Sequence, residues 1–181
     1  GEGYDIAIRV ANLADSSLRV RRLCAVRRIL VGAPDYFAAH GMPEHPRDLA
    51  THACFIYMHD GEPARWRFTL PDGGEFSFTP TGPVRGNSAE AFLPLLRAGQ
   101  GVAMLPEFMV WRDVDAGLLV PTLCTTQAPP LMLNLVTPPG GPRPARVTAV
   151  LDLLARRLSG AAWARALPPD ADSTRQGQPV T

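Results

Sequence analysis

Apolar residues along this chain occur either in short continuous runs or at helical spacing. The clearest short runs are Tyr4–Val10 and Arg28–Ala33, and each predicts a strand. Because polar positions do not alternate regularly within them, both predict strands covered on two faces, as in a parallel sheet. Further strands are predicted at Cys54–Met58, Val102–Leu105 and Leu131–Thr137.

A β-hairpin is predicted in the middle of the chain. Trp66, Phe68 and Leu70 stand at every second position, and so do Phe76 and Phe78. The sequence PDGG between these two sets has the residues that tight turns require. The hairpin indicates either a mixed sheet or an inserted second lobe.

Helices are predicted between these strands. Ala33–Gly41 has a proline in its first turn and a glycine past its end, which is typical of a short helix. A second helix follows Asn87 and Ser88, where Pro94 should either kink the helix or delay its start. Two more are predicted at Glu107–Ala116 and Arg143–Leu158. Strands that alternate with helices predict α/β architecture.

The charge of the chain argues against a polyanionic partner. The formal net charge is +1, and all 18 basic residues are arginine. Five of these arginines form a cluster in the sequence: Arg19, Arg21, Arg22, Arg27 and Arg28. No aromatic residues that could stack on bases lie between them, which favours a solvated or protein-facing surface over nucleic-acid binding.

The cysteines and histidines give no sign of a metal centre or a disulfide framework. Cys24, Cys54 and Cys124 lie far apart with no C-x-x-C, which predicts small, partly buried apolar side chains in a reducing cytoplasm. A redox-sensing thiol is the alternative. No two histidines lie three or four residues apart on a predicted helix, so we expect neither a metal ion nor a cofactor.

Catalytic and membrane-spanning signatures are not found in the sequence. It has no G-x-S-x-G elbow, phosphate loop or H-E-x-x-H motif, which predicts a protein that is not an enzyme. No apolar run approaches the roughly 20 residues that span a bilayer, so no membrane partner is expected.

Five segments of the sequence are more informative about the fold through their order and spacing than any one of them is alone. They are YDIAIRVANLADSSLRVRRL, RRILVGAPDYFAAHGMPEHPRDLATHACFIY, WRF with the hairpin after it, GNSAEAFLPLLRAGQGVAMLPEFMV, and GLLVPTL with the last helix. Together they resemble the effector-binding domain of LysR-type transcriptional regulators, from about Gly3 to Leu158. The resemblance implies a two-lobed α/β fold like that of type II periplasmic binding proteins, with an effector held between the lobes.

The resemblance also implies a division of the chain. Lobe one would comprise residues 1–30 and 130–160, and lobe two residues 31–129. Lobe one would be incomplete, because the family's domain begins with a strand, a helix and another strand before the DIAIR-like strand. DNA binding would belong to an N-terminal helix-turn-helix that this sequence lacks. The tail, residues 161–181, is polar and rich in Pro, Gly, Ser and Asp from Pro168 onward, and is expected to be disordered.

The predicted effector site draws on both lobes. Asn87 and Ser88 begin a helix, where unpaired backbone N–H groups favour a carboxylate, although Asn87 could simply cap that helix. Arg9 could bind an anion or pair instead with Asp15. Residues at the crossings between lobes are expected to serve as hinge and wall. The complete predicted set is Arg9, Val10, Asn12, Ala33, Gly86, Asn87, Ser88, Pro106 and Phe108.

We therefore predict a cytoplasmic, non-enzymatic sensor of a small organic effector, either a carboxylate or an aromatic compound. The intact regulator would be a homodimer or homotetramer. An exported solute-binding protein of the same fold is the first alternative, and a small hydrolase or transferase is the second.

Overall fold

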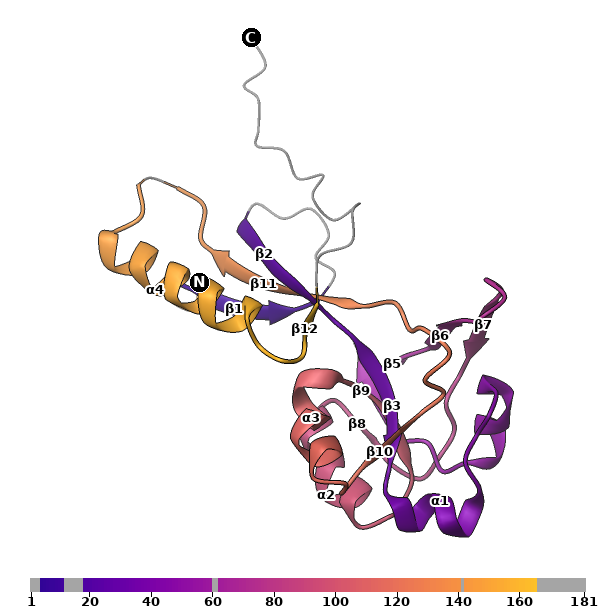
Figure 1. Ribbon diagram of the computed structural model, residues 1–181. Helices are drawn as coiled ribbons and strands as arrows, with labels where there is room; N and C mark the ends of the chain where they lie inside the picture. Colours follow the sequence, from indigo (N-terminus) through magenta and orange to yellow (C-terminus); the bar gives the residue numbers. More distant parts are fainter. Residues whose placement is uncertain (1–3, 12–17, 60–61, 141, 166–181) are drawn as a thin grey trace. The chain divides into compact units, whose positions relative to one another are not determined.

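The computed structural model describes residues 4–11, 18–59, 62–140 and 142–165, which fall into two compact units (Figure 1). Unit 1 is Gly1–Val26 with Leu131–Thr181, and unit 2 is Arg27–Pro130. The first boundary thus lies between Val26 and Arg27, earlier than the expected position after residue 30.

Unit 1 is built on a four-stranded antiparallel sheet. In spatial order its strands are β1 (Ala7–Val10), β11 (Leu131–Thr137), β2 (Arg19–Val26) and β12 (Ala164–Arg165). β11 pairs with β1 on one side, where Ala7 faces Val136, and with β2 on the other, where Arg19 faces Thr137. β11, from the second chain segment of unit 1, therefore lies between two strands of the first segment.

The expectation that Tyr4–Val10 is a strand covered on both faces is wrong. β1 is an edge strand that runs antiparallel to β11, and 51% of Ile8 is exposed. A short run with few polar positions does not by itself specify two covered faces, because an edge position leaves part of such a strand open to solvent. Residues 161–165, expected to be part of a disordered tail, instead include β12, which pairs with β2. Residues 166–181 lie outside the described part of the chain.

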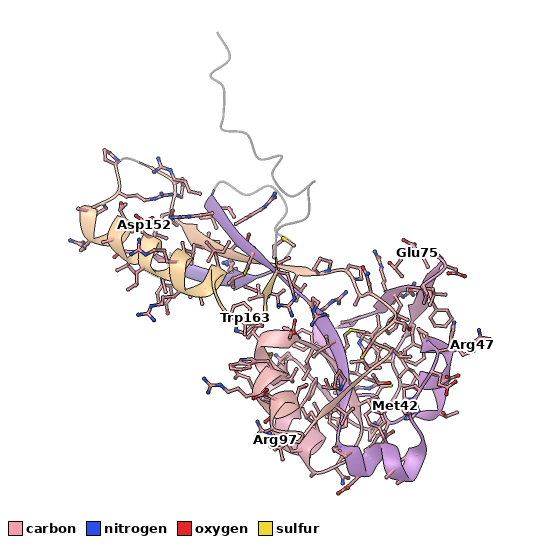
Figure 2. The ribbon with its side chains drawn as sticks, viewed as in Figure 1. Met42, Arg47, Glu75, Arg97, Asp152 and Trp163 are labelled. Carbon is pink, nitrogen blue, oxygen red and sulfur yellow. The ribbon has the colours of Figure 1, made fainter. Side chains whose placement is uncertain are left out.

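The helix α4 (Ala145–Ser159) supplies the apolar core of unit 1. Val147, Leu151 and Ala155 recur every four residues and pack with Leu135 of β11. Asp152, labelled on α4 in Figure 2, accepts from Arg21 Nη1 at 2.8 Å. Both side chains of this ion pair are about half exposed, so apolar contact contributes more than charge.

Replacing Leu151 with alanine should lower the free energy of unfolding of unit 1 by about 2–5 kcal/mol, because it leaves a cavity under α4. Leu153 on the same helix is 48% exposed, so Leu153→Ala is the matched control, with an expected change below about 1 kcal/mol. Urea titrations followed by circular dichroism would measure both. Equal losses in the two variants would contradict the packing of α4.

Unit 2 contains strands of both directions. Its strands are β3 (Arg28–Gly32), β4 (Ile56–His59), β5 (Glu62–Pro63), β6 (Trp66–Thr69), β7 (Glu75–Phe78), β8 (Arg85–Gly86), β9 (Val102–Pro106) and β10 (Val120–Thr122). β3 lies between β10 and β9 and is antiparallel to both, whereas β4 is parallel to β8. A parallel bridge between Cys54 and Val102 connects the segment leading into β4 with β9. β9, β4 and β8 therefore run in the same direction.

The hairpin and the helices of unit 2 lie close to the positions predicted from the sequence. The hairpin is confirmed as β6 and β7, with Trp66 facing Phe78 and Asp72 Oδ1 accepting from the N–H of Gly74 in the turn. Pro94 is the third residue of α2 (Phe92–Arg97), so the proline delays the start of that helix, and a 3₁₀ turn, η2 (Ala89–Ala91), precedes it. The helices of unit 2 are α1 (Pro34–His40), η1 (Pro46–Thr51), η2 (Ala89–Ala91), α2 (Phe92–Arg97) and α3 (Glu107–Asp115).

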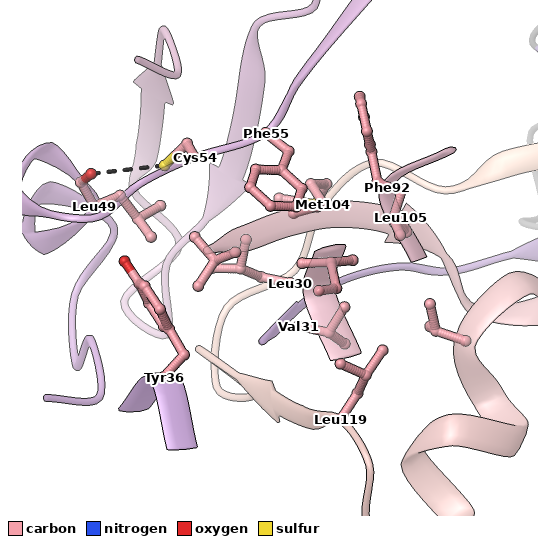
Figure 3. Packing of buried hydrophobic residues seen from close by; sticks show 14 of the residues in the cluster. Leu30, Val31, Tyr36, Leu49, Cys54, Phe55, Phe92, Met104, Leu105 and Leu119 are labelled. Carbon is pink, nitrogen blue, oxygen red and sulfur yellow. Dashed lines mark hydrogen bonds between the residues drawn. The ribbon is translucent and has the colours of Figure 1, made fainter. Parts of the chain in front are cut away.

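The larger apolar core lies in unit 2 (Figure 3). Leu30 of β3 and Leu105 of β9 are almost fully buried. The rings of Phe55 and Phe92 meet edge to face, with centroids 5.6 Å apart. These contacts join the sheet to α2 and make unit 2 a packed body in its own right.

The three cysteines differ in exposure. Cys24 and Cys54 are buried, whereas Cys124 is exposed, so the expectation of a partly buried side chain is wrong for Cys124. Burial raises the pKa of Cys54 to about 12, so its thiolate hardly forms at neutral pH, and Cys54 is a poor candidate for a redox sensor. Within the described residues no helix is both long enough and apolar enough to cross a bilayer.

Tyr36 of α1 joins this helix to the segment before β4. Its Oη accepts from the N–H of Ala53 at 2.9 Å and lies 3.2 Å from Nδ1 of His52. The ring of His40 stacks on Tyr36 with centroids 4.3 Å apart. Burial, followed by the charge of His40, lowers the pKa of His52, against a smaller opposing effect of Asp48.

The depressed pKa of His52 predicts a loss of stability in mild acid. The unfolded chain binds the imidazole proton near pH 6.5 and the folded chain only at lower pH, so stability is complete above about pH 6.5 and falls below it. Urea titrations between pH 7.5 and 5 should show this slope, and it should flatten in His52→Asn. Glu75→Gln, at an exposed position on β7, is the control and should keep the slope.

Candidate ligand-binding edge of unit 2

The carboxyl ends of β9, β4 and β8 meet at one edge of unit 2. Tyr57 faces Gly86 in the parallel register of β4 and β8, and the Cys54–Val102 bridge aligns β9 with them. The segments that follow β8 and β9 therefore leave the sheet on the same side, where ligands commonly bind in α/β folds. We call this region the carboxyl edge, and its predicted site residues are Gly86, Asn87, Ser88, Pro106 and Phe108.

Asn87 and Ser88 present free polar groups at the carboxyl edge. Both side chains are exposed, and Ser88 stands at the N-cap of η2 without a side-chain capping bond. Ser88 rather than Asn87 thus occupies the capping position. η2 has three residues and α2 six, so the dipole argument for anion binding is weak here. The amide and hydroxyl groups themselves are what this segment offers to a ligand.

Pro106 and Phe108 lie where β9 passes into α3. Both are half-buried, and Pro106 faces Arg28 in the antiparallel register of β3 and β9. Between them, Glu107 accepts from Arg27 through both oxygens, at 2.9 Å from Nε and 2.7 Å from Nη2. The N–H of Glu107 also donates to the carbonyl of Arg27 at 2.9 Å. The hydrogen bonds to Glu107 raise the pKa of Arg27 and fix the start of α3 against the start of β3.

Ala33 does not belong to the carboxyl edge. β3 is antiparallel to β9, so Gly32 faces Val102 at the amino end of β9, while Arg28 faces Pro106 at its carboxyl end. Ala33 follows Gly32 and is 4% exposed at the N-cap of α1. The structure therefore separates Ala33 from the other predicted residues of unit 2.

The predicted residues of unit 1 do not form one group either. Arg9 and Val10 are consecutive on β1, so their side chains point to opposite faces of the sheet. Arg9 is exposed and makes no ion pair with a described carboxylate. Asn12 and Asp15 lie outside the described residues, so the alternative Arg9–Asp15 pair stays a prediction.

Asn134 is a positioning residue that our sequence analysis missed. It is 1% exposed, and its Nδ2 donates to the carbonyls of Ala11 and Met132, both at 2.9 Å. These bonds fix the backbone where it leaves β1. A lone asparagine inside the apolar run Leu131–Thr137 was the available signal, because a buried amide has to find partners.

The Arg27–Glu107 ion pair should stabilise the fold more than the Arg21–Asp152 ion pair. The reason is exposure to solvent: the side chain of Glu107 is 12% exposed and that of Asp152 is 47% exposed. A double-mutant cycle with alanine at both positions should give a coupling energy of about 1 kcal/mol for the first pair and close to zero for the second. The coupling should shrink in 1 M salt. Equal couplings would contradict the proposed fixing of α3.

Comparison with known proteins shows the family to which the chain belongs. The family model described as the LysR substrate binding domain matches residues 1–159. The HTH-type transcriptional regulator CrgA of Neisseria meningitidis is 34% identical over 119 residues, which are 66% of this chain and 39% of CrgA. The HTH-type transcriptional activator AaeR of Escherichia coli is 30% identical over 155 residues, 84% of this chain and 49% of AaeR.

Solved structures agree with these matches. The CrgA regulatory domain from Neisseria meningitidis superposes with a TM-score of 0.75 at 30% identity, over 85% of this chain and 75% of that domain. Full-length AphB of Vibrio cholerae has a TM-score of 0.74 at 22% identity and supports the fold alone. The predicted α/β fold of the periplasmic-binding-protein type is thereby confirmed. The chain spans about half the length of the curated relatives it matches or less.

Proposed function

Since the chain belongs to the LysR substrate-binding-domain family, we propose that it is the effector-sensing part of a LysR-type transcriptional regulator. The effector is a small organic molecule that contacts the carboxyl edge of unit 2. The observation that carries this proposal is the pair of exposed, uncapped polar side chains, Asn87 and Ser88, beside the ends of parallel strands.

The chemistry of the carboxyl edge supports binding rather than catalysis. Asn87 offers both a donor and an acceptor, and Ser88 offers a hydroxyl that can do either. Pro106 and Phe108 add apolar surface from the β9–α3 junction. A few polar groups beside apolar walls are typical of small-molecule sites, and we propose that the protein has no enzymatic activity.

An effector can control transcription only if it binds one conformation of the regulator better than another. The proposal therefore requires that the carboxyl edge differ between an effector-bound and an effector-free state. DNA contact is assigned to the helix-turn-helix of the intact regulator, which works as a homodimer or homotetramer in the cytoplasm. Arg9 and Val10 remain predicted contacts from unit 1.

A thermal-shift screen of small carboxylates and aromatic compounds tests the proposal. A compound that binds only the folded chain raises the melting temperature, by an amount that grows with its concentration over its Kd. Ser88→Phe should abolish the shift by filling the carboxyl edge with a large ring. Thr148→Phe, at an exposed position on α4, is the control and should leave the shift unchanged.

Circular dichroism and the melting temperature without compound must match wild type for Ser88→Phe to be informative. A hit that stabilises the wild type and Ser88→Phe equally would remove Ser88 from the site. A broad screen with no hit at all would contradict effector binding.

A further inference from the structure

The carbonyl of Pro129 accepts a hydrogen bond from Arg28, and the charge of a second arginine, Arg67, acts on Arg28. Arg28 Nε donates to this oxygen at 3.0 Å. An isolated antiparallel bridge joins Thr69 to Gln127, through N–H···O bonds of 2.7 and 2.9 Å. Continued by two residues, this antiparallel register would bring the backbone of Arg67 opposite Pro129, and the effect of the Arg67 charge on Arg28 agrees with that position.

Neither arginine has a carboxylate partner among the described residues. Among the described residues, the side chain of Arg28 makes one hydrogen bond, to the carbonyl of Pro129, and the side chain of Arg67 makes none. Elsewhere in unit 2, Arg27 is paired with Glu107, and Arg97 with Asp113 at 2.8 Å. Arg28 and Arg67 thus lack the carboxylate partners that Arg27 and Arg97 have, and the charge of Arg67 acts on Arg28.

The surroundings of Arg28 make its charge costly. The residue is partly buried, and burial, followed by the charge of Arg67, lowers its pKa from the ordinary value of arginine. The shift leaves Arg28 protonated at neutral pH, because an arginine stays charged in proteins. A bound anion would offset both the lost hydration and the repulsion between the two cations.

We propose that Arg28 and Arg67 form an oxyanion site, which holds the carboxylate or phosphate group of the effector. With Nε committed to Pro129, Arg28 keeps two NH₂ groups, and Arg67 keeps its whole guanidinium fork, which matches the spacing of oxyanion oxygens. Arg28 faces Pro106 across β3 and β9, so the site adjoins the carboxyl edge. The inference rests on the proposed effector-binding function and names the chemical class of the effector.

Thermal shift and calorimetric titration of the 181-residue chain test the site with defined probes. Sodium phosphate represents a phosphate group and sodium benzoate a carboxylate, against sodium chloride at the same ionic strength. Benzamide, which lacks the charge, is the neutral counterpart of benzoate. We expect phosphate, benzoate or both to bind, and benzamide to bind at least about tenfold more weakly than benzoate where benzoate binds.

Variants locate the binding. Arg67 is exposed, so Arg67→Gln should fold normally and weaken anion binding by about tenfold or more. Arg67→Lys keeps the charge without the planar fork and should fall between wild type and Arg67→Gln. Arg156→Gln, at an exposed position on α4, removes the same charge from unit 1 and should bind like wild type.

Two outcomes would overturn the site: no anion binds more tightly than chloride, or Arg67→Gln and Arg156→Gln bind like the wild type. Failure of the oxyanion site and failure of the proposed sensor function would give different results. An effector lost in Ser88→Phe but kept in Arg67→Gln would leave the sensor function standing without the oxyanion site. Phosphate binding lost in Arg67→Gln, with no effector found in the screen, would leave the site without the sensor function.

Discussion

The hydrogen bond from Arg28 Nε to the carbonyl of Pro129 joins the two ends of unit 2. Unit 2 runs from Arg27 to Pro130, so folding of this unit brings its first and last residues together. The end of β2 and the start of β11 directly flank unit 2, so its folding brings them close in space, and the two strands pair from Val26 and Leu131 onward. Without a folded unit 2, β11 would have to find β1 across a loop of more than a hundred residues, with the loss of chain entropy this entails. The sheet of unit 1 is in this sense a consequence of how unit 2 closes.

The sequence predicts a helix or a strand well when the residues that specify it lie close together along the chain. The hairpin β6–β7 has both its period of two and its turn residues within 13 positions, Trp66–Phe78, and α4 has its apolar repeat within one helix. The direction and the neighbours of a strand depend on distant residues. The apolar run at β1 therefore predicted a strand but not its edge position, and two-residue strands such as β8 and β12 carry no periodic signal at all.

The same limit explains the outcome for the candidate site. Gly86–Ser88 and Pro106 stay predicted site residues, and the parallel register of β4 and β8 shows why these segments leave the sheet on one side. Ala33 was grouped with them as a residue at a crossing between the lobes, but β3 runs opposite to β9 and carries Ala33 to the other end. Arg28 was counted among surface arginines because sequence spacing does not show its hydrogen bond to Pro129 or the effect of the Arg67 charge on it.

The contrast among the three thiols has a practical consequence. Cys24 and Cys54 are shielded by the protein, whereas Cys124 lies in the exposed turn between β10 and β11. A maleimide dye should therefore attach at one position of the native sequence, without engineered cysteines. That position is three residues before Gln127, the bridge partner of Thr69, so a fluorophore there would report from the same segment that carries Pro129.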